Sequence, residues 1–339
     1  VAVLTAPPGA GKTTRVPPAL LDLLPAGGRI VMLEPRRLAA VSAARWMARA
    51  LDEEVGRTVG YAIRFERRVS AATRIEVVTE GILTRRLQAD PGLEGVSLVI
   101  FDEFHERSLN ADLALALCLD ARRTLREDLA LLVMSATLEA GPVAALLGGA
   151  TVVDAPGKTF AVDVRYLEGV RDSRPSRVPA LVAGAVGRAL AETEGDVLAF
   201  LPGAGEIRAC AELLRGSAAP AGGAVGLHPL YADLPFEAQE LALLPGARRR
   251  VVLATSIAET SLTIEGVRIV IDSGLARRVE HHAASGMGRL VTVREARSQA
   301  DQRAGRAGRT APGVCYRIFS RQDYEALTAF APPELLVAD

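Results

Sequence analysis

The sequence has few of the residues that staple small extracellular domains together or bind zinc. Only three cysteines occur in 339 residues, and Cys118, Cys210 and Cys315 lie far apart. An odd number without paired spacing argues against a disulfide framework and against a zinc site, so we expect buried small apolar residues. No run of about 18 apolar residues is present, nor is a signal-peptide pattern. These absences predict a cytoplasmic protein without a membrane partner.

The chain also lacks net charge and has almost no lysine. Its 40 basic residues balance 40 acidic ones, and all the basic residues except Lys12 and Lys158 are arginines. Nucleic acid would therefore have to be bound by local clusters of arginine. The aromatic content of 4% argues against an extended platform for stacking bases. Lys12 is informative because it stands in a glycine-rich segment, where a compact ammonium group fits better than a guanidinium.

Short β-type runs alternate with helical patterns in both halves of the chain, which is typical of parallel sheets flanked by helices. The strands expected in the first half are Val1–Thr5, Arg29–Leu33, Arg74–Thr79, Ser97–Phe101, Leu129–Met134 and Thr151–Val153. Those expected in the second half are Asp196–Leu201, Ala224–Leu230, Arg249–Ala254, Val267–Ile271 and Gly313–Phe319. Helical patterns cover Pro35–Leu51, Ser108–Leu125, Ser176–Glu194, Gly205–Arg215 and Phe236–Leu244.

Turn residues in Asp154–Lys158 follow a strand and mark a boundary between two α/β domains. The length suits about two domains of ordinary size. We therefore predict domains at residues 1–156 and 157–325, with 326–339 beginning a truncated accessory region. The chain starts without Met in the apolar stretch Val1–Leu4 and ends in Leu335–Asp339, and both ends look like cut edges of a longer protein.

The segment Ala6–Thr13 follows an apolar strand and precedes a helix-compatible stretch, as a phosphate-binding loop requires. Gly9 and Gly11 would let backbone N–H groups converge on phosphates. Lys12 would reach the β- and γ-phosphates, and the hydroxyl of Thr13 would hold Mg²⁺. An alanine replaces the first glycine of the usual pattern, where a small residue suffices. The alternative is a glycine-rich turn with an incidental lysine.

Asp102 and Glu103 directly follow the apolar run Ser97–Phe101. A strand that ends in two carboxylates delivers them to the carboxyl edge of a sheet, beside the phosphate loop. Asp102 suits Mg²⁺, which prefers oxygen ligands, and Glu103 can orient and deprotonate an attacking water. His105 is a candidate site residue because it lies next to these two carboxylates; alone, it would more often be structural. The alternative is a solvated acidic loop.

The segment Gln302–Arg309 alternates arginines with small residues in the second half of the chain. Arg306 and Arg309 are three residues apart, so a helical turn would project both from one face. A transferring phosphoryl group needs such cations, and their supply from a second domain makes hydrolysis depend on closure. The alternative is an arginine cluster that is exposed or binds the phosphates of a nucleic-acid backbone. Because the other domain carries a phosphate loop, arginine fingers are favoured.

In this order, these segments resemble the motifs of superfamily 2 helicases. Their residues are most similar to those of the DEAH-box branch. The resemblance extends over Ala6–Thr14, Glu34–Ala40, Thr79–Arg85, Asp102–His105, Ser135–Thr137, Leu201–Ile207, Ala254–Ile264 and Gln302–Arg309. Phe104 replaces the alanine expected in Asp-Glu-Ala-His. The resulting Asp-Glu-Phe-His sequence resembles that of the bacterial HrpB-type helicases, with the HrpA type as the alternative. The resemblance implies two tandem RecA-like P-loop domains, each a mostly parallel sheet flanked by helices. It also implies ATP and Mg²⁺ as cofactors and a winged-helix region after the second domain.

The resemblance further implies roles for single residues. The residues that would bind the nucleotide are Pro8, Gly9, Ala10, Gly11, Lys12, Thr13, Thr14, Arg45, Thr263 and Glu265. Among them, Arg45 would stack on adenine, while Thr263 and Glu265 would lie near the ribose. Gln302 would position the hydrolytic water with Glu103. Ser135 and Thr137 would couple the nucleotide site to strand movement.

The resemblance also implies contacts to a single-stranded backbone. The residues expected to make them are Arg36, Arg37, Thr79, Gly81, Arg85, Gly203, Thr255 and Ser256. Such groups position phosphates without reading sequence, so little sequence preference is expected. The segment Gly274–Val293 would carry a β-hairpin near the point of strand separation. A metal site at His281 and His282 is the rival interpretation, but adjacent side chains diverge and no third ligand is evident.

The expected function is ATP-driven movement, 3′ to 5′, along a single strand, with RNA as the expected partner and a monomer as the expected state. One alternative is an ATPase that remodels RNA–protein complexes without processive unwinding, which shares every motif. A second is a non-catalytic RNA-binding module, which the intact polar residues argue against. A third is a P-loop ATPase acting on protein or membrane partners, which the second-domain motifs argue against.

Overall fold

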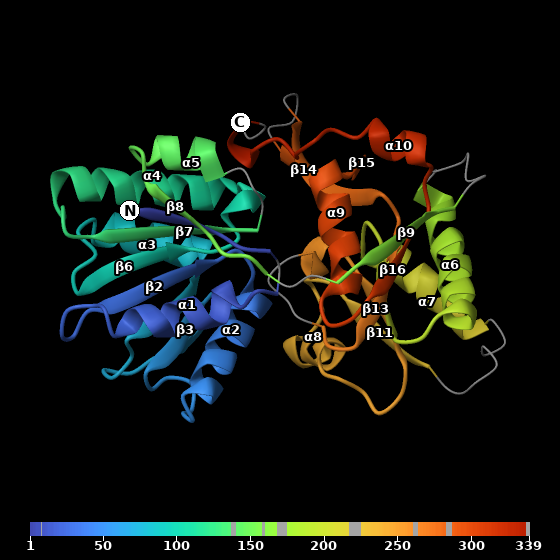
Figure 1. The fold of residues 1–339 in the computed structure, drawn as a ribbon, viewed down its shortest axis with the longest axis horizontal. Coiled ribbons are helices and arrows are strands. Elements are labelled where there is room, and N and C mark those ends of the chain that lie inside the picture. Colours follow the sequence, from blue (N-terminus) through green and yellow to red (C-terminus); the bar gives the residue numbers. More distant parts are fainter. Residues whose placement is uncertain are drawn as a thin grey trace. The chain divides into compact units, whose positions relative to one another are not determined.

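The computed structural model contains two compact α/β units, Val1–Gly157 with Pro333–Ala338, and Lys158–Pro332 (Figure 1). The structure describes residues 1–7, 9–136, 140–157, 160–167, 175–216, 225–259, 264–282 and 287–336. Three residues assigned to the functional site, Pro8, Thr137 and Thr263, lie outside the described residues. Ala224, the first residue of an expected strand, lies outside them as well.

The first unit is built on a sheet with the strand order β4-β3-β5-β2-β6-β7-β1-β8. Its strands are β1 (Ala2–Thr5), β2 (Arg29–Glu34), β3 (Val59–Ile63), β4 (Glu66–Arg68), β5 (Ile75–Thr79), β6 (Val96–Phe101), β7 (Ala130–Ser135) and β8 (Thr151–Asp154). Strand β4 pairs antiparallel with β3, whereas the other pairs are parallel. The parallel strands bring their carboxyl ends to one edge of the sheet.

Helices cover both faces of this sheet (Figure 1). They are α1 (Lys12–Leu21), α2 (Arg37–Ala50), α3 (Glu80–Ala89), α4 (Leu109–Thr124) and α5 (Ala140–Leu146), with the 3-10 turns η1 (Phe104–Glu106) and η5 (Glu334–Leu336). Right-handed crossovers place α1 and α2 on one face and α3, α4 and α5 on the other. Packing of α1 on α2, and of α3 on α4, agrees with this division.

The second unit is built on an all-parallel sheet with the strand order β11-β12-β10-β13-β16-β9. Its strands are β9 (Val162–Tyr166), β10 (Asp196–Phe200), β11 (Gly226–Leu230), β12 (Arg250–Ala254), β13 (Val267–Asp272) and β16 (Gly313–Arg317). An antiparallel hairpin, β14 (Leu275–His282) and β15 (Met287–Arg294), stands apart from this sheet (Figure 1). The hairpin expected within Gly274–Val293 is therefore confirmed.

The helices of the second unit also lie on two faces. They are α6 (Val178–Glu192), α7 (Ala204–Gly216), α8 (Phe236–Leu243), α9 (Arg297–Gly305) and α10 (Arg321–Glu325), with the 3-10 turns η2 (Pro175–Arg177), η3 (Ser256–Ala258) and η4 (Arg306–Gly308). The crossover rule places α6 and α7 on one face of the sheet and α8 and α9 on the other. None of the helices in the described ranges is long and apolar enough to cross a membrane.

Each unit has its own apolar core. The central strands supply continuous apolar runs because both of their faces are covered by helices. In β10, for example, Val197, Ala199 and Phe200 are fully buried. Cys118, Cys210 and Cys315 are free thiols buried in these layers, as the sequence predicted. Burial raises the pKa of Cys118 and of Cys210 to about 12, so these thiols are unreactive.

Candidate functional site

The loop between β1 and α1 has the backbone that a phosphate cradle requires. Gly9 and Gly11 have φ angles of 84° and 85°, in the left-handed region that glycine adopts readily. Lys12 is the first residue of α1, so the positive end of that helix faces the same loop. The side chain of Ala6 is buried and its N–H donates to the carbonyl of Ser135 at 3.2 Å. A small residue fits there, which accounts for alanine in place of glycine.

Four predicted site residues meet at the carboxyl edge of the first sheet. The hydroxyl of Thr13 donates to Asp102 Oδ2 at 2.5 Å. Lys12 Nζ lies 3.6 Å from Glu103 Oε1, with both side chains about 5% exposed. The N–H of Glu103 donates to Asp102 Oδ1 at 2.8 Å. Strand β6 delivers the two carboxylates and β1 leads to the loop, with only β7 between them in the sheet.

His105 connects this acidic segment to the end of β7. Its Nδ1 lies 3.4 Å from Glu103 Oε2 and accepts a hydrogen bond from the N–H of Ala136 at 3.4 Å. Glu103 has a φ of 49°, a left-handed conformation that a non-glycine residue adopts at a cost of about 1–3 kcal/mol. Phe104 points into the core, edge-on to Phe101 at 6.2 Å between ring centroids. The phenylalanine of this segment is therefore a packing residue, separate from the polar cluster.

Sequence reasoning missed Glu34, a fully buried carboxyl group at the end of β2. Burial raises its pKa well above the usual range, and the neighbouring Asp102 and Glu103 raise it further. The pKa of Asp102 is also raised by burial and by Glu103, whereas Lys12 and the hydroxyl of Thr13 lower it. The cluster thus holds more buried acid than Lys12 can neutralise. Its only signal in the sequence was a charged residue at the end of an apolar strand.

The donor set of this cluster fits Mg²⁺. Thr13 and Asp102 present hard oxygen atoms in contact with each other, with the carboxyl groups of Glu34 and Glu103 beside them. A divalent cation prefers such oxygens and would favour the ionised form of these carboxyl groups. Among the described residues no group of three or more histidine, cysteine, aspartate or glutamate side chains could enclose a metal ion. A cation here would accordingly be shared with phosphate oxygens, as is usual for Mg²⁺.

The residues assigned to nucleic acid in the first unit follow two adjacent strands. Arg36 comes after β2 and Thr79 ends β5, and these strands pair in parallel. Arg36 Nη2 forms an ion pair with Glu106 Oε2 at 3.1 Å. The further residues are exposed at the starts of α2 and α3 or one turn later: Arg37, Gly81 and Arg85. All five therefore lie at the carboxyl edge of the sheet.

The second unit repeats this placement. Gly203 follows β10 and Thr255 and Ser256 follow β12, and these two strands are parallel neighbours in the sheet. A Cβ atom on Gly203 would come within 2.6 Å of the guanidinium carbon of Arg277. Glycine therefore allows the arginine of strand β14 to pack directly on the loop.

Arg45 and Glu265, two residues expected to contact the nucleotide, lie in different units. Glu265 precedes β13, and its carbonyl accepts a hydrogen bond from Arg250 Nη2 at 2.6 Å, at the amino edge of the sheet. It therefore lies at the opposite edge from Thr255, because the chain has already turned back before β13 begins. Arg45 is exposed in the middle of α2. The contacts of both residues with a nucleotide stay predictions from the resemblance.

The predicted finger arginines lie at the end of α9. Arg306 begins η4 and is 3% exposed, and its Nε donates to the carbonyl of Glu259 at 2.9 Å. Arg309 caps the same turn and is half-buried, as is Gln302 one turn earlier. These three residues are thus carried by one continuous helical segment.

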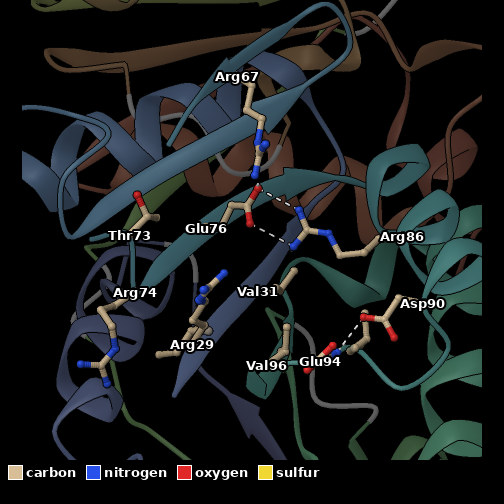
Figure 2. Close-up of a pocket in the computed structure, with 12 residues that line it drawn as sticks. Arg29, Val31, Arg67, Thr73, Arg74, Glu76, Arg86, Asp90, Glu94 and Val96 are labelled. Carbon is tan, nitrogen blue, oxygen red and sulfur yellow. Dashed lines mark hydrogen bonds and ion pairs between the residues drawn. The ribbon is translucent and has the colours of Figure 1, made fainter. Parts of the chain in front are cut away.

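A separate hollow of about 200 Å³ opens at the amino ends of β2, β5 and β6 (Figure 2). Some of its charged side chains contact one another. Arg86 makes two hydrogen bonds to Glu76, at 2.8 and 3.0 Å, and Arg67 lies 3.9 Å from the same carboxylate. Arg74 Nε donates to the carbonyl of Gly28 at 2.6 Å. This hollow lies at the edge opposite the predicted site residues and holds none of them.

Glu80, between Thr79 and Gly81, predicts a dependence of stability on pH. Burial raises its pKa from 4.5 to about 7, while a hydrogen bond from Ser108 opposes the shift. Because the folded pKa exceeds the unfolded one, this group stabilises the fold fully below about pH 4.5 and loses that contribution as the pH rises through 7. Glu80→Gln, which stays neutral, should therefore gain about 3 kcal/mol in free energy of unfolding over the wild type by pH 8.

Urea denaturation at pH 5 and pH 8 measures this difference. The gain from Glu80→Gln should be small at pH 5 and large at pH 8. The exposed Glu94→Gln serves as the control and should show no such trend. A gain for Glu80→Gln that is equal at both pH values would contradict the assignment.

Comparisons with known proteins agree with this geometry. Residues 1–146 match the DEAD/DEAH box helicase family, and residues 181–311 match the helicase conserved C-terminal domain. The chain is 47% identical to the ATP-dependent RNA helicase HrpB of Escherichia coli over 99% of its own length and 41% of that protein. It is 36% identical to the ATP-dependent RNA helicase HrpA homolog of Haemophilus influenzae, over 99% of its length and 26% of the relative.

Solved structures give the same result. The crystal structure of the Escherichia coli DEAH/RHA helicase HrpB matches with a TM-score of 0.90 and 46% identity, covering all of this chain and 43% of that one. The crystal structure of the Escherichia coli DExH-box NTPase HrpB matches with a TM-score of 0.84 and 47% identity, covering 100% and 41% of the two chains. This chain thus spans less than half the length of these relatives. It belongs to the DEAD/DEAH box helicases and comprises their two tandem RecA-like domains.

Proposed function

We propose that this chain couples ATP hydrolysis to 3′-to-5′ movement along single-stranded RNA. The observation that carries the proposal is the convergence of Lys12, Thr13, Asp102 and Glu103 on one buried cluster beside a glycine loop. The printed names of two similar proteins, both ATP-dependent RNA helicases, support RNA as the nucleic acid. The monomeric state, the cytoplasmic location and the accessory region remain predictions from the sequence.

For hydrolysis, each residue of the cluster has a distinct role. Lys12 would bind the β- and γ-phosphates, and Thr13 and Asp102 would hold Mg²⁺, which supplies positive charge against the phosphate oxygens. Glu103 would take the proton of the attacking water, and its pairing with Lys12 and His105 sets the direction of its carboxylate. From the second unit, Gln302 would orient the water.

Arg306 and Arg309 would add positive charge to the transferring phosphoryl group. Supply from another unit makes hydrolysis require both units, so nucleotide turnover can drive a change between them.

For movement, side chains at the carboxyl edge of each sheet would contact the backbone of the nucleic acid. In the first unit, the guanidinium groups of Arg36 and Arg37 and the hydroxyl of Thr79 suit contacts to phosphates without base recognition. Thr255 and Ser256 would make the corresponding contacts in the second. Grip by each unit in turn on one strand would produce steps in one direction. Ser135, beside the phosphate loop and at the end of β7, would relay the state of the nucleotide.

Strand displacement from tailed duplexes tests the proposal. With ATP and Mg²⁺, the chain should displace a short RNA strand from a duplex with a 3′ single-stranded tail, and not from blunt or 5′-tailed duplexes. Displacement only from the 5′-tailed duplex would contradict the direction. ATP hydrolysis that RNA stimulates without displacement of any strand would favour the remodelling alternative.

A further inference from the structure

A buried arginine in the second unit joins segments that the sequence separates. Arg303 lies in α9 with its side chain 1% exposed, among the carboxylates of Glu259, Asp272 and Glu295. Its Nε donates to Glu259 Oε1 at 2.7 Å, and its Nη1 donates to Asp272 Oδ1 at 2.8 Å. Glu295 Oε2 lies 2.5 Å from Nη1. One guanidinium thus bridges three carboxylates from separate segments of the second unit.

The three carboxyl groups around Arg303 lie close enough to influence one another. Burial raises the pKa of Glu295 well above its usual range, and although Arg303 lowers it, Asp272 and Glu259 raise it further. Glu259 and Asp272 accept hydrogen bonds from different nitrogens of the guanidinium. A fork-shaped cation can satisfy both at once, whereas a lysine ammonium cannot reproduce that geometry.

Glu259 connects this arginine to the turn proposed to contact nucleic acid. It directly follows the 3-10 turn η3, and its N–H donates to the carbonyl of Ser256 at 3.0 Å. Its carboxylate accepts from Arg303, and its carbonyl accepts from Arg306 Nε at 2.9 Å. One residue therefore contacts both arginines and directly follows the turn. A shift of the turn must displace Glu259.

The other side of Arg303 is fixed to the sheet. Asp272 ends β13, and the carbonyl of Leu275 accepts from Arg303 Nη1 at 3.2 Å. The guanidinium also lies over the ring of Phe200, 4.8 Å from its centroid. A close-packed site of this kind cannot absorb a displacement by local rearrangement. A shift of Glu259 is therefore passed along α9 toward Arg306.

We propose that Glu259 and Arg303 are positioning residues that transmit contact of RNA with Thr255 and Ser256 to the arginine finger Arg306. The inference rests on the proposed function, which supplies the roles of the turn and of the finger. It adds a path between them, contained within the second unit. RNA would stimulate hydrolysis because it fixes the turn, and the turn then fixes Glu259 and the arginine bound to its carbonyl.

Glu259→Gln tests the path with little change in shape. The glutamine oxygen can still accept one hydrogen bond, and Arg303 keeps Asp272 as an ionic partner, so the fold should persist. The expected result is a roughly tenfold loss in the stimulation of ATP hydrolysis by single-stranded RNA. The rate without RNA, the affinity for RNA and the KM for ATP should stay as in the wild type. A residue with a merely structural role would change all of these together.

Asp301→Asn is the matched control, because Asp301 also pairs with a buried arginine and lies on the same helix, 2.8 Å from Arg317. Stimulation by RNA should be unchanged in this variant. If Glu259→Gln does not fold, as judged by its melting temperature, Arg303→Lys is measured instead and should show the same selective loss.

Three outcomes decide the matter. Selective loss of stimulation supports the path. The path is overturned if stimulation stays at the wild-type level. It is also overturned if RNA binding, or the rate without RNA, falls as much as the stimulation does. A wild-type chain whose hydrolysis RNA does not stimulate would contradict the proposed function itself, and so is distinguishable from failure of the path.

Discussion

Lys12→Ala is expected to reduce ATP turnover by roughly 10²- to 10³-fold, the effect typical of losing one preorganised charge in a water-excluded site. Lys12 is buried, and its ammonium group lies 3.6 Å from the carboxylate of Glu103. The variant removes the cation that would meet the phosphates and the ammonium group that pairs with Glu103. Hydrolysis of ATP at saturating Mg²⁺ measures the loss.

The variant needs a check on folding, because removing one member of a buried pair costs stability. Lys12→Arg retains the charge but brings a guanidinium too large for the loop, so it should also be nearly inactive while it folds. Arg49→Ala, at the exposed end of α2, is the control and should hydrolyse ATP normally. If a folded Lys12→Ala protein hydrolysed ATP as fast as the wild type, the loop would not be the phosphate-binding site.

Arg306→Ala is expected to lower kcat by about 10³-fold or more, the range measured for arginine fingers. Its guanidinium would act on charge that develops only in the transition state, so the affinity for ATP should change little. This separates it from a residue that merely binds the nucleotide. Steady-state kinetics give kcat, and equilibrium binding of a non-hydrolysable ATP analogue gives the affinity.

Arg248→Ala provides the comparison for Arg306→Ala, since Arg248 is exposed in the same unit and outside the proposed site. Its kinetics should match those of the wild type. An Arg306→Ala protein with unchanged kcat and a raised KM would show that Arg306 binds the ground state and is no finger.

The central strands could be predicted because their sequences carry strong signals. Strands β10 and β12 each carry an unbroken run of four apolar residues, as expected when helices cover both faces. Strand β9 was missed because Val162–Tyr166 alternates apolar with charged residues and lies at an edge of its sheet. Strand β4, Glu66–Arg68, has three exposed charged residues and pairs through its backbone with β3. Such edge pairings leave little trace in composition.

The site was predictable to the extent that its residues are close in sequence or follow a strand. Lys12 and Asp102 could be placed together because carboxyl ends of parallel strands share an edge. Glu34 and Arg303 were missed because their environments arise from packing between distant segments. The role of Glu265 came from the resemblance and stays a prediction; the residue itself lies at the amino edge of its sheet.

The most direct test of the account is the ATP hydrolysis rate of this chain with and without single-stranded RNA. The account predicts Mg²⁺-dependent hydrolysis that rises when RNA is added and is abolished by Lys12→Ala at every RNA concentration. Single-stranded DNA in a parallel titration distinguishes RNA from nucleic acid in general. Hydrolysis that neither nucleic acid changes, or that persists in Lys12→Ala, would contradict a motor built on these two domains.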